Sequence, residues 1–310
     1  MDQRSNRLTN PVVLCLLALF CCALWGSAFP FIKIGYRLFA IPSDAPGAQI
    51  LFAGIRFAFA GVLVILIGSI TEKRVLIPKL DAMPKVLLLS LFQTVLQYVF
   101  FYVGLAHTTG VKASIINGAG VFMSILAAVL FRMEKLNAQK VAGCLLGFAG
   151  VVLVNLMQGS VDFSFSPVGE GFILISAASS ALSSVAIKRF SQTLDPVMLS
   201  GWQFLCGGAV MMVIGLLLGG TLTTVTFSGI MVLCWLAFVS AAAYSVWSLL
   251  LKYNPVSKVA VFGFANPVFG VILSALLLAE GQSFGWMTLC ALLLVSAGIA
   301  TVYMKRKEEA

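Results

Sequence analysis

The sequence predicts an all-α integral membrane protein, in which ten transmembrane helices form two inverted five-helix repeats around a central cavity. The composition, the spacing of the apolar runs and an internal repeat predict this fold class. Of the 310 residues, 60% are hydrophobic and only 10% are charged, and the mean hydropathy is +1.04. A soluble domain carries about a quarter of its residues as charges. The composition therefore excludes soluble, disordered, coiled-coil and disulfide-scaffold proteins.

Ten apolar runs are long enough to cross a bilayer, because a helix needs about 20 such residues to span the hydrocarbon core. The runs are unbroken and lack the alternation of a membrane β-barrel. The first run is too long for the apolar region of a signal peptide, so we count it as a span. The predicted spans are 12–35, 47–70, 85–106, 112–132, 138–158, 168–188, 197–218, 228–251, 258–279 and 285–304.

The positions of the basic residues predict the orientation. With a cytoplasmic N-terminus, 16 of the 20 Lys and Arg residues fall in cytoplasmic segments and only Arg37 and Lys112 fall outside. Lys33 and Arg56 lie within spans. Cytoplasmic loops of membrane proteins carry such an excess of Lys and Arg, so both termini are expected in the cytoplasm. These cations face anionic lipid headgroups, and the net charge of +9 therefore requires no nucleic-acid partner.

An internal repeat appears when the chain is shifted by 146 residues. Tyr98 then falls on Tyr244, Lys112 on Lys258, and Glu134 on the glutamate at 280, without a gap. Each half, 1–160 and 161–310, contains five spans. Because five is odd, the halves enter the membrane from opposite sides, which is an inverted repeat of the kind found in many secondary transporters.

Several short motifs follow one another along the two halves in a fixed order. They are Trp25-Gly26-Ser27, Lys33, Arg56-Phe57, Tyr98, Ala113-Ser114, Glu134, Tyr244, Pro255, Asn266-Pro267, Glu280 and the Gly298 region. In these residues the chain resembles the drug/metabolite transporter superfamily, in its EamA-like ten-helix branch. The fourth span departs from the family pattern: it has Asn117-Gly118-Ala119-Gly120 where such proteins commonly carry a proline.

The resemblance implies export of small metabolites, amino acids or drugs across the bacterial inner membrane by alternating access. It also implies a central cavity between the halves, lined by spans one, three, four, six, eight and nine. We expect a small-molecule substrate and membrane lipid as partners, no metal or cofactor, and a monomer or homodimer. Drug efflux and metabolite uptake are the alternatives within transport.

Polar side chains are expensive inside lipid, so their positions indicate candidate sites. In the third span, Gln93 and Gln97 lie one turn apart beside Tyr98. A site of aromatic walls and neutral hydrogen-bonding groups suits a zwitterionic or mildly polar solute. The alternative is hydrogen bonding between helices, which commonly uses Asn, Gln and Ser. The candidate substrate-binding residues are Trp25, Gln93, Gln97, Tyr98, Asn117, Ser180, Tyr244 and Asn266.

Other residues are interpreted as structural. Tyr102 and Trp247 are expected to be interfacial anchors. Lys33 is expected to reach the membrane surface. Arg56 could bind a substrate carboxylate, or it could pair with a backbone carbonyl or reach the outer surface, and we favour the structural interpretation. Glu134 and the glutamate at 280 are expected at the interface.

No Asp or Glu falls in the middle of any predicted span. A proton-driven antiporter usually carries an embedded carboxylate, so we expect transport without a midplane proton relay. A lipid-modifying membrane enzyme is a distant alternative. Such an enzyme needs clustered metal ligands or an acid–base pair, whereas the only histidine is His107, and no second ligand is near it in the sequence.

Overall fold

The computed structural model describes residues 7–108, 110–156, 165–278 and 286–303, and this part of the chain contains helices and no strand. Ten helical segments follow one another and agree with the ten predicted spans, several of them in more than one piece. They are α2 (Pro11–Leu38); α3 (Pro46–Glu72); α4 (Met83–Ser90), η2 (Leu91–Leu96) and α5 (Gln97–Ala106); α6 (Gly110–Gly118) and α7 (Gly120–Leu130); α8 (Ala138–Leu156); η3 (Pro167–Gly171) and α9 (Phe172–Phe190); α10 (Pro196–Leu217); α11 (Phe227–Tyr253); α12 (Val256–Ala260), η4 (Val261–Phe264) and α13 (Ala265–Leu278); and α14 (Trp286–Tyr303).

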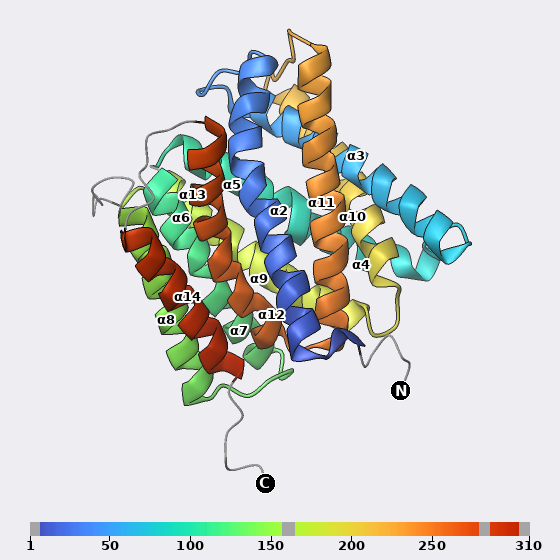
Figure 1. The fold of residues 1–310 in the computed structure, drawn as a ribbon. Helices are drawn as coiled ribbons and strands as arrows, with labels where there is room; N and C mark the ends of the chain where they lie inside the picture. The colour runs from blue at the N-terminus through green and yellow to red at the C-terminus, as the bar shows by residue number, and fades with distance from the viewer. Residues whose placement is uncertain (1–6, 109, 157–164, 279–285, 304–310) are drawn as a thin grey trace.

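Eight of these segments are long and apolar enough to cross a membrane, while α8 and α14 contribute shorter apolar helices. The helix α2 begins and α14 ends on the same side of the bundle (Figure 1).

The sequence sets several of the helix starts. Asn10 and Asp195 cap α2 and α10 by accepting hydrogen bonds from backbone N–H groups of the first turn, and a proline follows each cap. Proline suits this position because its missing N–H has no helical partner there.

The contacts between spans follow the same pattern in both halves: when each span is replaced by its counterpart five positions away in the other half, the same pairs of spans are in contact. The second span packs most heavily against the seventh, α3 against α10, and the fifth against the tenth, α8 against α14. The first span, α2, packs on the eighth and ninth, whereas the sixth, α9, packs on the third and fourth. Figure 1 shows α2 between α11 and α13, and α8 beside α14. An inverted repeat produces this exchange.

Glycines bring α3 and α10 into backbone contact. A Cβ added to Gly54 would lie 2.6 Å from the backbone nitrogen of Met212, and one added to Gly208 would lie 2.3 Å from that of Ala58. Small residues let membrane helices approach closely, which replaces the hydrophobic driving force that lipid removes.

The third, fourth and ninth spans are irregular. A π-helical stretch, η2, interrupts the third. The fourth breaks at Ala119, within the Asn117–Gly120 stretch that lacks proline, and the ninth passes through the 3-10 helix η4 before Asn266 and Pro267. Ala119 and Ala265 are equivalent under the 146-residue shift, so the two halves break at matching positions.

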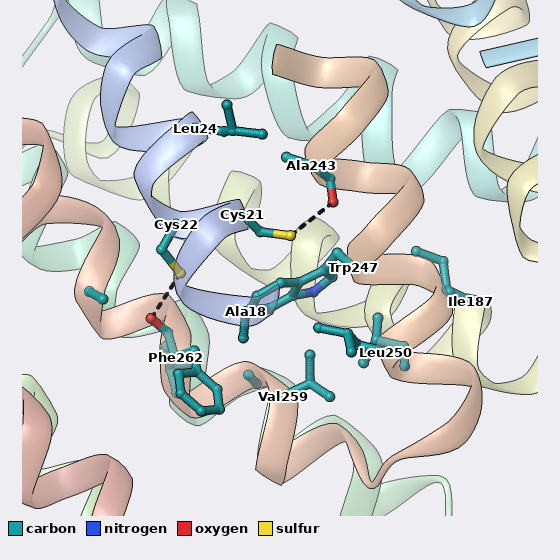
Figure 2. Packing of buried hydrophobic residues seen from close by; sticks show 14 of the residues in the cluster. Ala18, Cys21, Cys22, Leu24, Ile187, Ala243, Trp247, Leu250, Val259 and Phe262 are labelled. Atoms are coloured by element: carbon teal, nitrogen blue, oxygen red, sulfur yellow. Dashed lines mark hydrogen bonds between the residues drawn. The ribbon is translucent and has the colours of Figure 1, made fainter. Parts of the chain in front are cut away.

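Two cysteines of α2 form hydrogen bonds with α11 and η4, which belong to the second half of the chain. The thiol of Cys21 donates to the carbonyl oxygen of Ala243 at 3.4 Å, and that of Cys22 donates to the carbonyl oxygen of Phe262 at 3.2 Å. Figure 2 shows the two thiols pointing to different helices, with Trp247 beside Cys21. All seven cysteines are free thiols, as expected of small buried side chains.

Candidate functional site

Tyr98 of α5 and Tyr244 of α11 meet inside the bundle, where their hydroxyl oxygens lie 2.6 Å apart in a hydrogen bond. The ring of Trp25 contacts Tyr244 edge-on with centroids 5.0 Å apart, and Phe204 contacts it at 4.9 Å. Phe57 lies 4.4 Å from Tyr98. Five spans thus contribute to one group of rings, which we call the aromatic cluster: Trp25, Phe57, Tyr98, Tyr102, Phe204, Tyr244 and Trp247.

The expectation that Tyr102 and Trp247 are interfacial anchors is wrong. Tyr102 is 4% exposed and its ring lies 6.3 Å from that of Tyr98. Trp247 is 9% exposed and contacts Trp25 at 5.0 Å. Both residues extend the aromatic cluster, because each lies one helical turn beyond Tyr98 or Tyr244 on the same helix face.

Arg56 of α3 is buried beside the aromatic cluster, with only 3% of its surface exposed. Its Nη2 and Nε donate to the hydroxyl oxygen of Ser240 at 2.9 and 3.1 Å, and Ser240 donates in turn to the carbonyl oxygen of Leu236. The guanidinium lies 4.7 Å from the ring centroid of Phe57. The expectation that Arg56 reaches the surface or a backbone carbonyl is therefore wrong.

The guanidinium of Arg56 brings a positive charge to the edge of the aromatic cluster, because it lies over Phe57, whose ring also contacts Tyr98. The sequence pattern contained one sign of this role, namely a cation about a third of the way into a span. It did not contain the direction of the side chain, which depends on how α3 packs against α11.

Three of the candidate amides present buried acceptor oxygens. Gln93 Oε1, Gln97 Oε1 and Asn266 Oδ1 have no hydrogen-bond partner within the described residues, and neither does the donor Trp25 Nε1. Gln93 lies in the π-helical stretch η2, and Gln97 follows directly after it. Leaving a buried polar group unpaired costs about 1–3 kcal/mol, so such a group in a native protein needs an explanation such as a ligand.

Asn117 and Ser180 are placed differently. Asn117 is exposed near the end of α6, and Ser180 is half-buried on α9. In the described part of the chain, no side-chain hydrogen bond or ring contact joins either residue to the aromatic cluster. Ser176, one turn before Ser180, instead ties α9 to the third span by donating to the Gln97 carbonyl oxygen at 2.6 Å.

An open pocket of about 560 Å³ lies at the end of α2, lined by Lys33, Tyr36, Arg37 and residues 40–43. Lys33 is exposed there, as expected of a side chain that reaches the surface. Tyr36 has a buried hydroxyl, and its side chain packs against the core residues that include Tyr102 and Tyr244. The pocket is therefore at one end of the bundle, and Tyr36 contributes to both the pocket and this core.

Carboxylates join the two halves at opposite ends of the bundle. At the end where α2 begins, Glu134 accepts hydrogen bonds from Lys140 Nζ at 2.7 Å and from the backbone and hydroxyl of Ser257. Burial alone raises the pKa of Glu134, but these hydrogen bonds outweigh it and hold the pKa below its ordinary value. The expectation of a simple interfacial glutamate is incomplete, because the side chain is 8% exposed. The glutamate at 280 lies outside the described residues.

At the other end, Glu170 accepts hydrogen bonds from Thr108 and from the backbone N–H of Ser166, and it forms an ion pair with Lys112 at 3.4 Å. Thr108 and Lys112 belong to the first half of the chain, and Glu170 to the second. We call these two contacts the Glu134 connection and the Glu170 connection. A third charged contact between the halves, from Arg74 to Asp195 at 3.5 Å, is more exposed.

A bundle of long apolar helices with exchange symmetry and buried polar groups at its centre defines a multi-pass membrane protein. The particular family follows from a match to the model of the EamA-like transporter family, over residues 13–156 and 167–304. This match covers most of the chain, and the chain belongs to that family.

Relatives support the same assignment. The chain is 28% identical to an "Uncharacterized transporter" of Archaeoglobus fulgidus, over 95% of this chain and 99% of the relative. It is 28% identical to the "Probable amino-acid metabolite efflux pump" of Salmonella typhimurium, over 91% and 92%. It is 27% identical to "WAT1-related protein At3g02690, chloroplastic" of Arabidopsis thaliana, over 88% of this chain and 66% of that protein.

A solved crystal structure shares the fold. It superposes with a TM-score of 0.74 at 18% sequence identity, over 94% of this chain and 97% of the other. At this identity the likeness concerns the arrangement of the helices alone.

Proposed function

We propose that this transporter exports small metabolites, with amino acids and similar zwitterionic solutes as its substrate class, across a bacterial inner membrane with both termini in the cytoplasm. The observation that carries the proposal is the contact between Tyr98 and Tyr244. It lies among aromatic rings and beside buried amide oxygens, where an organic solute finds apolar walls and a few polar groups. The name of the Salmonella relative supports the same substrate class.

The two halves, 1–160 and 161–310, are proposed to rock against each other in alternating access. The Glu134 and Glu170 connections support this proposal because they lie at opposite ends of the bundle and each joins the halves. Alternating access requires that only one end be open at a time, so one connection breaks while the other holds. The remaining candidates, Asn117, Ser180 and Asn266, are proposed to line the path on the fourth, sixth and ninth spans, and the working unit is a monomer or homodimer.

The test is counterflow of radiolabelled amino acids and related metabolites into proteoliposomes. Tyr98→Ala and Tyr244→Ala are expected to reduce flux of the transported solute at least tenfold. The matched control is Tyr253→Ala, because Tyr253 lies on the same helix as Tyr244 but contacts Lys252 at the helix end. Normal flux in both cluster variants, with any transported compound, would remove the aromatic cluster from the proposal.

Direction separates the proposal from its alternatives. In inverted vesicles, the cytoplasmic face of the protein faces the outer medium. An exporter therefore moves labelled amino acid from the medium into the vesicle lumen, whereas an importer moves it from the lumen into the medium. A preference for apolar cations over amino acids would favour drug efflux instead.

A further inference from the structure

Arg56 carries a buried charge that has no ion-pair partner in the described part of the chain. Only 3% of its surface is exposed, and the ion pairs of the described residues involve Arg74, Lys112 and Lys140 but not Arg56. Its neighbours Ser240 and Phe57 are neutral. An uncompensated charge in a low-dielectric interior is strongly unfavourable, and charged residues within membrane spans commonly mark the path of a substrate or ion.

The guanidinium also retains free hydrogen-bonding capacity. It has five N–H donors, and its observed hydrogen bonds use Nε and Nη2, both directed to the Ser240 hydroxyl. Nη1 has no hydrogen bond among the described residues. Ser240 thus holds one edge of the guanidinium, and it lies on α11 one helical turn before Tyr244. The planar fork of an arginine matches the two oxygens of a carboxylate.

The same region of the bundle also contains hydrogen-bond acceptors, the side-chain oxygens of two glutamines. Gln97 directly precedes Tyr98 on α5, and Ser240, which holds Arg56, lies one helical turn before Tyr244 on α11. The hydrogen bond between Tyr98 and Tyr244 brings these positions together. The Oε1 atoms of Gln97 and Gln93 are buried without a hydrogen-bond partner in the described segments. A solute with a carboxylate and a protonated amine supplies both missing partners, because its anionic end matches Arg56 and its N–H donors match the amide oxygens.

We propose that Arg56 binds the carboxylate of the transported solute, and that Ser240 positions the guanidinium to do so. The inference rests on the proposed function and deepens it, because it makes a carboxylate the group that the transporter requires.

The experiment compares each radiolabelled amino acid of the panel with its carboxamide, which lacks the carboxylate charge, and with the corresponding 2-oxo acid, which lacks the amine. In wild-type proteoliposomes, the unlabelled amino acid is expected to compete for flux and the carboxamide is not. Arg56→Gln is expected to raise the KM for the amino acid about 10- to 100-fold, the usual loss when a hydrogen bond to a charged group is removed. Arg56→Lys keeps the charge but loses the fork, and its KM is expected to fall between the two.

Thermal unfolding in detergent provides a readout that a purely structural arginine would not give. Without solute, Arg56→Gln is expected to unfold at the same temperature as wild type or higher, because the substitution removes an unpaired buried charge. The amino acid is expected to raise the unfolding temperature of wild type and to leave that of Arg56→Gln unchanged. Arg189→Gln is the control, since Arg189 is an exposed cation at the end of α9.

The outcomes separate the two proposals. A carboxylate-dependent thermal shift that Arg56→Gln abolishes, without counterflow of any panel compound, supports the carboxylate site and overturns the transport proposal. Counterflow in Arg56→Gln with the wild-type KM overturns the inference and leaves transport intact. The inference is also overturned if the amino acid and its carboxamide raise the unfolding temperature of wild type equally. It is overturned as well if Arg56→Gln unfolds at a markedly lower temperature while Arg56→Lys binds the amino acid normally.

Discussion

Tyr98 and Tyr244 are 146 residues apart in the chain, and their hydroxyl oxygens are 2.6 Å apart in the structure. The same 146 residues separate the two halves of the repeat. Two residues that an approximate twofold axis exchanges can touch only near that axis. The hydrogen bond therefore marks the centre of the exchange symmetry, between the third and eighth spans, and any rocking of the halves has to keep or break it.

The first prediction concerns this hydrogen bond. Tyr98→Phe and Tyr244→Phe each remove one hydroxyl and leave the other unpaired, so the double variant is expected to lose less stability than the sum of the two. The coupling energy is expected to be about 0.5–1.5 kcal/mol, the range for one hydrogen bond between helices in a membrane. A double-mutant cycle on unfolding in detergent measures it. Strictly additive effects would show that the two hydroxyls are not bonded.

The second prediction concerns the contact between α3 and α10. Gly208→Ala would place a Cβ 2.3 Å from the backbone nitrogen of Ala58, so one of the two helix backbones would have to shift. Overpacking of this kind costs about 1–3 kcal/mol, so we expect a lower unfolding temperature and less monodisperse protein on size exclusion. Gly171→Ala is the control, because its added Cβ meets nothing closer than 3.8 Å. Equal behaviour of the two variants would contradict the close approach.

The third prediction concerns the pH dependence of the Glu134 connection. The pKa of Glu134 is lower in the folded protein than its ordinary value, so its contribution to stability is present above the ordinary value and is lost as pH falls through the lowered pKa. Glu134→Gln is expected to lower stability at pH 7 by about 1 kcal/mol, with the difference from wild type shrinking below about pH 4.5.

Thermal unfolding between pH 3 and 8 measures this difference. Glu72→Gln is the matched control: Glu72 pairs with Arg74, whose side chain is 59% exposed, and exposed pairs contribute little. A pH profile of Glu134→Gln that runs parallel to that of wild type over the whole range would show that the Glu134 carboxylate does not stabilise the fold.

The number and limits of the spans were predictable from sequence because they depend on the length of apolar runs alone. The predicted span 197–218 corresponds to Pro196–Leu217, and 228–251 to Phe227–Tyr253. The repeat placed Tyr98 and Tyr244 at equivalent positions of two helices, so it indicated that the two residues are related. It did not predict the distance between their hydroxyl groups.

The direction of side chains around each helix was not predictable in the same way. Hydrophobic residues surround these helices on all sides, so periodicity does not distinguish the face turned to lipid from the face turned inward. Tyr102, Trp247 and Arg56 were misassigned for this reason. The π-helical stretch η2 adds a second cause, because its wider turn changes the facing of Gln93 relative to the helix before it. Asn117 is exposed near the break at Ala119, where the register of the fourth span changes.

The last prediction concerns energy coupling. In the described residues, every Asp and Glu lies in a loop or at the end of a span. Glu134 and Glu170, which both join the halves, lie at opposite ends of the bundle. A proton relay needs a carboxylate that meets both sides in turn near the midplane, and the centre offers Arg56 and tyrosines instead.

Counterflow of the transported solute is therefore expected to continue when a protonophore collapses the pH gradient across proteoliposomes. Glu134→Gln and Glu170→Gln are expected to slow exchange without changing its response to the protonophore, because each weakens a connection between halves and not a proton path. Loss of net flux on collapse of the gradient would contradict this mechanism, and a variant of either glutamate that becomes insensitive to pH would identify that residue as the proton carrier.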